Sequence, residues 1–154
     1  DVADLARRTV CDVPARAVIV VPAAPAVRKA LSSIEASERR LLLVSADDPC
    51  GAMAALMAFT YGATAEENCE RMTVAAERVT TLCVPDAEQS LEAVVSGSGV
   101  DGAEVEIATL YYGSGIDAAV AEDAAARVAG LLGLAGCEAI YGGQRECPFL
   151  IALE

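Results

Sequence analysis

Two short, uninterrupted apolar runs in the first third of the chain constrain the fold most strongly. Residues 16–21 (RAVIVV) and 40–45 (RLLLVS) are dominated by branched aliphatic side chains, and Pro22 stops the first run. Runs of this kind are typical of strands buried on both faces of a parallel sheet. Pro25 suits the first turn of a helix that we expect to extend to about residue 36. The segment therefore predicts a right-handed βαβ unit.

The clearest helix begins after Thr64. Thr64 and Glu67 have the spacing of a capping box, in which each side chain satisfies a free backbone amide at the helix start. An apolar stripe follows, and a shorter apolar helix is expected before it, over residues 52–59. Residues 80–84 are then predicted to form a third strand, which the strand–helix alternation places in the same parallel sheet.

The second half of the chain has a different order of elements. We predict a strand over residues 104–112, a long Ala-rich helix over 116–134, and two strands over 137–141 and 149–153. Gly97, Gly99 and Gly102 match G-x-G-x-x-G, but the pattern opens a strand here rather than a helix, so it indicates a linker. We therefore expect an α/β protein: a parallel α/β subdomain at residues 1–95, a linker at 96–103, and a strand–helix–strand–strand subdomain at 104–154.

Charge and composition exclude several classes of function. The chain has 11 Lys and Arg against 23 Asp and Glu, a net charge of −12, which disfavours nucleic acid and anionic membrane surfaces as partners. It has no histidine, which removes His-based triads and His-ligated zinc. The longest apolar run, residues 17–27, contains two prolines and is too short to span a bilayer. The first residues resemble no secretory signal, so a cytoplasmic piece of a longer protein is expected.

The six cysteines stand at irregular spacings without a C-x-x-C pair. In a cytoplasmic protein they are expected to be reduced thiols in the core. The alternative is a disulfide between Cys137 and Cys147, which a hairpin of the last two strands would bring together.

Two loops at predicted strand ends carry candidate chemistry. Gly113, Ser114 and Gly115 lie between a strand and a helix, where backbone amides can hold an anion, although nearby acidic residues oppose one. Asp47 and Asp48 follow the second strand, where carboxylates could bind Mg²⁺ or transfer protons. For this pair we favour a turn with Pro49 followed by a helix start. No catalytic residue and no metal site stand out.

The C-terminal run is the most distinctive motif. Tyr141-Gly142-Gly143-Gln144, then Pro148, an aromatic residue, an apolar run and a final Glu154 resemble the end of the fatty acid kinase ATP-binding subunit, in the dihydroxyacetone-kinase-like family. Leu110-Tyr111-Tyr112-Gly113 resembles an earlier strand end of that family. The resemblance covers residues 1–85 and 104–154. The chain departs from it at residues 22–25, where the family has polar residues, and between residues 84 and 91, where it is shorter.

The resemblance implies a non-catalytic docking region. In that family the module that binds ATP and Mg²⁺ lies elsewhere in the chain, so no cofactor is expected within these residues. The C-terminal region is linked to docking a fatty-acid-binding partner subunit, which presents the acyl group for phosphorylation; a homodimer is also possible. The residues that we expect to bind the partner are Tyr111, Tyr112, Tyr141, Gly142, Gly143, Gln144 and Pro148.

The alternative is a small-molecule-binding domain or a kinase-like enzyme. Its site would lie at the strand ends of residues 47–51 and 113–115, with a triose or a fatty acid as the substrate. The absence of histidine weakens the triose version, because covalent capture of dihydroxyacetone in that family uses histidine.

Overall fold

The computed structural model describes residues 4–5, 8, 15–32, 40–86 and 91–154. The chain divides into two compact units, Asp1–Val79 and Thr80–Glu154.

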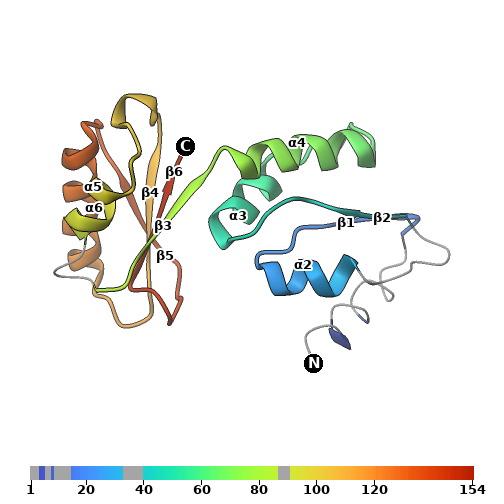
Figure 1. The fold of residues 1–154 in the computed structure, drawn as a ribbon, viewed down its shortest axis with the longest axis horizontal. Coiled ribbons are helices and arrows are strands. Elements are labelled where there is room, and N and C mark those ends of the chain that lie inside the picture. Colours follow the sequence, from blue (N-terminus) through green and yellow to red (C-terminus); the bar gives the residue numbers. More distant parts are fainter. Residues whose placement is uncertain (1–3, 6–7, 9–14, 33–39, 87–90) are drawn as a thin grey trace. The chain divides into compact units, whose positions relative to one another are not determined.

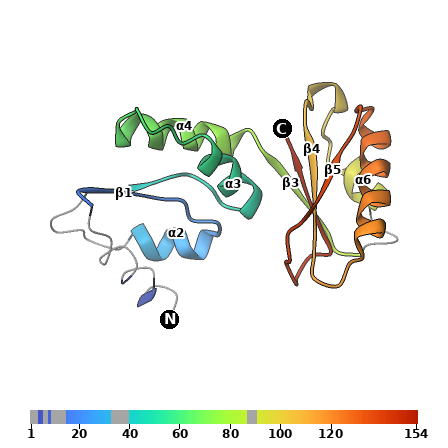
Figure 2. The same cartoon turned by 180° about the vertical axis from the view of Figure 1, so that it is seen from behind.

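The first unit is built on two parallel strands. β1 (Ala17–Val20) pairs with β2 (Arg40–Leu43) in the register Val18↔Leu41, and α2 (Pro25–Ser32) lies between them in the chain. α3 (Pro49–Met57) and α4 (Ala65–Glu77) pack against each other on the side of the sheet opposite α2 (Figures 1 and 2). The parallel βαβ unit is therefore confirmed. The core of the first unit includes Val44, Ala46, Ala52, Ala55, Met72 and Ala76.

The capping box at the start of α4 is also confirmed. The Thr64 hydroxyl accepts from the Glu67 amide, and the Glu67 carboxylate accepts from the Thr64 amide at 2.8 Å. This hydrogen bond from the Thr64 backbone, with a second from its hydroxyl, holds the pKa of Glu67 below its usual value. The carboxylate at this helix start is therefore charged at neutral pH.

The second unit is a four-stranded mixed sheet with helices on one face. Its strands are β3 (Thr80–Val84), β4 (Ala108–Tyr112), β5 (Glu138–Tyr141) and β6 (Phe149–Leu153), in the order β3-β6-β4-β5. β6 is antiparallel to both of its neighbours, and β4 is parallel to β5. Both α5 (Leu91–Gly97) and α6 (Ala118–Leu132) cover the same face (Figure 1). The core includes Val84, Leu91, Leu110, Val128, Phe149 and Ile151.

The strand–helix–strand–strand order of residues 104–154 is confirmed, but the prediction for β3 is wrong. β3 pairs antiparallel with β6 rather than extending a parallel sheet, with Val84 opposite Phe149. This pairing moves residues 80–95 from the predicted first subdomain into the second unit.

The predicted linker at residues 96–103 also lies within the second unit. There Gly102 opens a short 3₁₀ helix (Gly102–Glu104), and a Cβ at Gly102 would collide with the Leu132 carbonyl oxygen. The glycine thus allows a close approach of two backbones rather than free motion.

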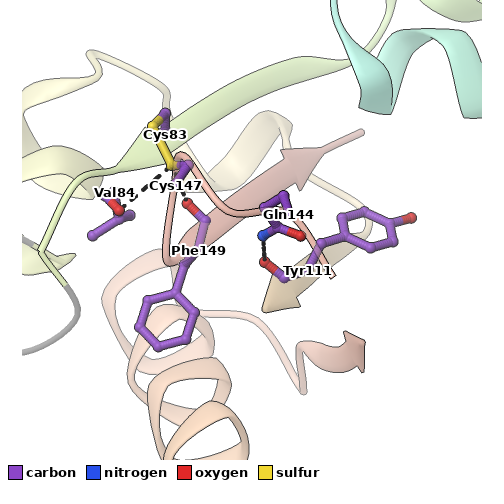
Figure 3. Close-up of a disulfide and its surroundings, with 6 residues drawn as sticks. All are labelled: Cys83, Val84, Tyr111, Gln144, Cys147 and Phe149. Atoms are coloured by element: carbon purple, nitrogen blue, oxygen red, sulfur yellow. Dashed lines mark hydrogen bonds between the residues drawn. A yellow bond between two sulfur atoms is a disulfide. The ribbon is translucent and has the colours of Figure 1, made fainter. Parts of the chain in front are cut away.

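A disulfide joins Cys83 to Cys147, which overturns the prediction of reduced thiols for this pair (Figure 3). It links β3 to the loop that precedes β6, with the Cα atoms 6.1 Å apart. The alternative pair of Cys137 and Cys147 is also wrong, because Cys147 is bonded to Cys83, and β4 lies between β5 and β6, which therefore form no hairpin. Cys50, Cys69 and Cys137 remain thiols, as predicted, whereas Cys11 lies outside the described residues.

Asn68 is a buried polar residue that holds the connection between α3 and α4. Only 2% of its surface is exposed; its Oδ1 accepts from the Thr60 amide at 2.8 Å, and its Nδ2 donates to the Thr60 carbonyl at 3.0 Å. The side chain therefore replaces the backbone partners that this turn lacks.

We expect Asn68→Ala to lower the free energy of unfolding of the first unit by about 2 kcal/mol, because it leaves the polar backbone groups of Thr60 without these partners. Urea unfolding followed by far-ultraviolet circular dichroism measures this loss. Glu70→Ala, an exposed change on the same helix, serves as the control. A loss below about 0.5 kcal/mol for Asn68→Ala would show that water satisfies the turn equally well.

Candidate functional site

The aromatic residues predicted to bind a partner lie at the carboxyl ends of β4 and β5. Tyr112 and Tyr141 are register partners on these parallel strands. Their ring centroids are 5.4 Å apart at an interplanar angle of 63°, an edge-to-face contact. Tyr141 is 62% exposed, whereas Tyr112 is half-buried against the core. The pair thus presents an aromatic surface on a rigid base.

The glycine-rich loop after β5 is fixed to the end of β4. The amides of Gly142 and Gly143 both donate to the Tyr112 carbonyl, at 2.9 and 3.2 Å. The Gln144 side-chain amide donates to the Tyr111 carbonyl at 2.8 Å (Figure 3). Gly143 has φ +70°, a left-handed conformation that favours glycine. The structure therefore gives Gln144 a positioning role for this loop.

Gly113 and Pro148 close the same loop from the other side. The Gly113 amide donates to the Pro148 carbonyl at 2.8 Å, and the Ser114 amide donates to the Gln144 carbonyl at 3.0 Å. A Cβ at Gly113 would lie 2.5 Å from the Gln144 carbonyl oxygen, so only glycine fits without displacing the backbone. The structure thus brings all the predicted partner-binding residues together at one end of the second unit's sheet.

The same hydrogen bonds bear on the predicted anion site at residues 113–115. The amides of Gly113 and Ser114 are already engaged with carbonyl groups, and the side chain of Asp117 caps α6 by accepting from the Ala119 amide. An anion at this turn would have to displace contacts that stabilise the loop. The geometry therefore favours a structural role for these residues.

The aspartates at the end of β2 lie in the first unit and have local partners. Asp48 is the N-cap of α3 and accepts from the amides of Cys50 and Gly51 at 2.9 and 3.0 Å. Asp47 forms an ion pair with Arg28 at 3.0 Å, and Arg28 also donates to the Ser45 hydroxyl at 3.0 Å. These contacts support the turn and helix start that the sequence favours for this pair. The contacts of Arg28 with Asp47 and Ser45 were not predicted, because they depend on how α2 packs near the end of β2.

Cys137 lies in a hollow of about 420 Å³ beside α6. Burial raises the pKa of its thiol to about 11, so the thiol is protonated at neutral pH.

Within the described ranges, no three His, Cys, Asp or Glu side chains gather as metal ligands would. Nor does any helix in the described part of the chain have the length and apolar character needed to cross a membrane.

One exposed apolar surface was not predicted. α3 was expected to be an apolar helix, and the structure leaves Met53, Leu56 and Met57 exposed on it. The signal was present in residues 49–59, which contain no charged, hydroxyl or amide side chain. That signal cannot show which face of the helix its own unit covers.

Comparisons with known proteins give one clear relationship. The family model of the FakA-like C-terminal domain of fatty acid kinase matches residues 6–93. The match does not extend to residues 104–154, where the resemblance of the C-terminal motif stays a prediction. No curated protein matches the chain significantly.

Among solved structures, CetZ2 from Haloferax volcanii, in a GTPγS-bound protofilament, is 16% identical. That alignment covers 98% of this chain and 58% of the other. Its TM-score of 0.28 is too low to indicate a shared fold. The family match alone covers more than half of the chain, and the protein therefore belongs to the FakA-like C-terminal family of fatty acid kinases.

Proposed function

We propose that this chain is a non-catalytic docking domain of a fatty-acid-kinase-like protein. It would hold a fatty-acid-binding partner subunit while a kinase domain elsewhere, with ATP and Mg²⁺, phosphorylates the acyl group. Phosphoryl transfer depends mainly on positioning and on charge stabilisation, so a domain that only orients the acyl carrier contributes to rate. The cytoplasmic location stays a prediction.

The observation that carries this proposal is the exposed Tyr141, which contacts Tyr112 and precedes a loop that hydrogen bonds hold in place. Tyr141 is 62% exposed, yet its neighbours Gly142, Gly143 and Gln144 are hydrogen-bonded to the end of β4. A surface that is ordered before binding loses little conformational entropy on association. Tyrosine is also one of the residues that most often carries binding energy in interfaces.

We expect Tyr141→Ala to weaken binding to the fatty-acid-binding partner by at least tenfold, because it removes the most exposed member of the pair. Isothermal titration calorimetry with the purified partner measures the dissociation constant. Val120→Ala, an exposed apolar change on α6, is the matched control and should leave binding unchanged. Absence of any binding by the folded wild-type chain would contradict the proposed function.

The small-molecule alternative has no observation in its favour. Its two loops, at residues 47–51 and 113–115, lie in different units. In the first loop the Asp48 carboxylate already accepts a hydrogen bond from a backbone amide. In the second loop the amides of Gly113 and Ser114 already donate to backbone carbonyls.

A further inference from the structure

α3 has an apolar face that the described residues of its own unit leave uncovered. The helix buries Cys50, Gly51, Ala52 and Ala55, whereas Met53, Leu56 and Met57 are 43%, 60% and 85% exposed. These three positions recur at spacings of three and four, so they lie on one side of the helix. A helix that is apolar on all sides is normally covered on all sides. The exposed side therefore indicates a contact surface.

Two aromatic residues extend this surface beyond the helix. Phe59 is 42% exposed and Tyr61 is 98% exposed, and their ring centroids are 5.3 Å apart at 89°. Thr60, between them, is held at both its amide and its carbonyl by Asn68. The aromatic pair is thus fixed to α4 rather than free to collapse onto the core. We call Met53, Leu56, Met57, Phe59 and Tyr61 the α3 ridge.

An acidic hollow adjoins the α3 ridge. It has a volume of about 460 Å³, and its lining includes Thr60, Gly62, Glu67, Glu70 and Arg71. The charged residues of this lining are two glutamates and one arginine. Residues 49–70 contain three glutamates and no lysine or arginine, and the third, Glu66, pairs with Arg40. The hollow is thus suited to a cationic side chain.

We propose that the α3 ridge and the acidic hollow form a docking surface for the fatty-acid-binding partner, which would supply an apolar recess flanked by a lysine or arginine. This inference rests on the proposed docking function and adds a surface in the first unit to the strand-end site in the second. Methionine side chains adapt to the shape of a partner, and the lowered pKa of Glu67 keeps its carboxylate charged.

Charge favours this partner over two others. A second copy of the chain carries the same net charge of −12, so the two copies would repel each other. An anionic membrane surface would be repelled by the same excess of carboxylates. A basic patch around an apolar recess instead complements both parts of the surface and would accelerate association.

The test compares variants of the intact chain for binding to the purified fatty-acid-binding partner. We expect Leu56→Glu with Met57→Glu to raise the dissociation constant at least tenfold, because both side chains would be buried on docking. Ile107→Glu, at a position that is 55% exposed in the second unit, is the matched control. Glu70→Lys is expected to slow association severalfold, with a smaller effect at high salt.

Each other outcome has a distinct meaning. Unchanged binding by the ridge variant, with binding lost in Tyr141→Ala, overturns this inference and leaves the proposed function standing. No binding by the wild-type chain overturns the proposed function itself. Light scattering that shows a wild-type dimer and a monomeric ridge variant identifies a second copy as the occupant. A lowered unfolding midpoint in the ridge variant shows that the ridge is covered within its own chain. Either of the last two results overturns the inference.

Discussion

Replacing Cys83 with serine is expected to lower the free energy of unfolding of the second unit by about 4 kcal/mol. The disulfide to Cys147 spans 64 residues, and closing a loop of that length restricts the unfolded chain by about this amount. Since small domains are stable by only about 5–15 kcal/mol, the loss is a large part of the total. Urea unfolding followed by near-ultraviolet circular dichroism measures it, because Tyr111, Tyr112 and Tyr141 all lie in this unit.

The folded state itself should change little in this variant. Cys83 is exposed, so a serine hydroxyl there can reach water. The Sγ atom of Cys147 lies 3.0 Å from the Phe149 carbonyl oxygen, and a reduced thiol could donate to it. The expected cost therefore comes from the lost crosslink and not from an unsatisfied group in the core.

Two controls separate the crosslink from other effects. Cys137→Ser removes a thiol of the same unit that takes no part in the disulfide, and it is expected to cost much less. Dithiothreitol should bring the wild-type chain to the stability of Cys83→Ser and should leave that variant unchanged. Equal stability of the wild-type chain with and without the reductant would show that the disulfide does not form in solution.

The sequence predicted the features that depend on neighbouring residues. The capping box of Thr64 and Glu67 is local, and so are the apolar runs that became β1 and β2. The strand–helix–strand–strand order of the second half follows from the same kind of signal. Each of these features is encoded within a few turns or one strand length, so periodicity and capping rules suffice.

The errors all concern contacts between distant residues. β3 has the composition of a buried strand, and nothing within residues 80–84 specifies that its neighbour is the antiparallel β6 at the end of the chain. The pairing of Cys83 with Cys147 follows from that register, so it could not be predicted once β3 was assigned to a parallel sheet. For the same reason, the two units divide after Val79 and not at residues 96–103, where the linker was expected.

The candidate site was predicted in part. The motif around Gly142 and Gln144 pointed to one loop, and the structure shows the contact that holds this loop, a hydrogen bond from the Gln144 side-chain amide to the Tyr111 carbonyl. The α3 ridge was missed because an apolar helix predicts burial. Only the packing of α4 against α3 shows which face of the helix remains exposed. Asn68 was missed because a buried asparagine in a helix is recognised only by the turn that it supports.

Phe149→Ala is expected to destabilise the second unit by about 3–5 kcal/mol, the usual cost of removing a buried phenylalanine. Phe149 is fully buried on β6, opposite Val84 on one neighbouring strand and Tyr112 on the other. Its ring therefore joins β3 and β4 to the core beneath the helices. Its loss leaves a cavity in the core beside β6. Phe149→Leu, which retains part of the volume, should cost less than half as much, and Ile107→Ala, an exposed change, should cost under about 0.5 kcal/mol.

The effects of Phe149→Ala and Cys83→Ser should not add, because the two positions share one strand pair. Val84, next to Cys83, is opposite Phe149, and the Phe149 carbonyl lies beside the Cys147 sulfur. Residues in contact typically couple by about 0.5–3 kcal/mol in a double-mutant cycle. The same urea titrations measure this coupling. If the two losses of unfolding free energy add exactly, the disulfide and the core contact hold β3 to β6 independently. That result would contradict the expectation that β3 and β6 unfold as one cooperative unit.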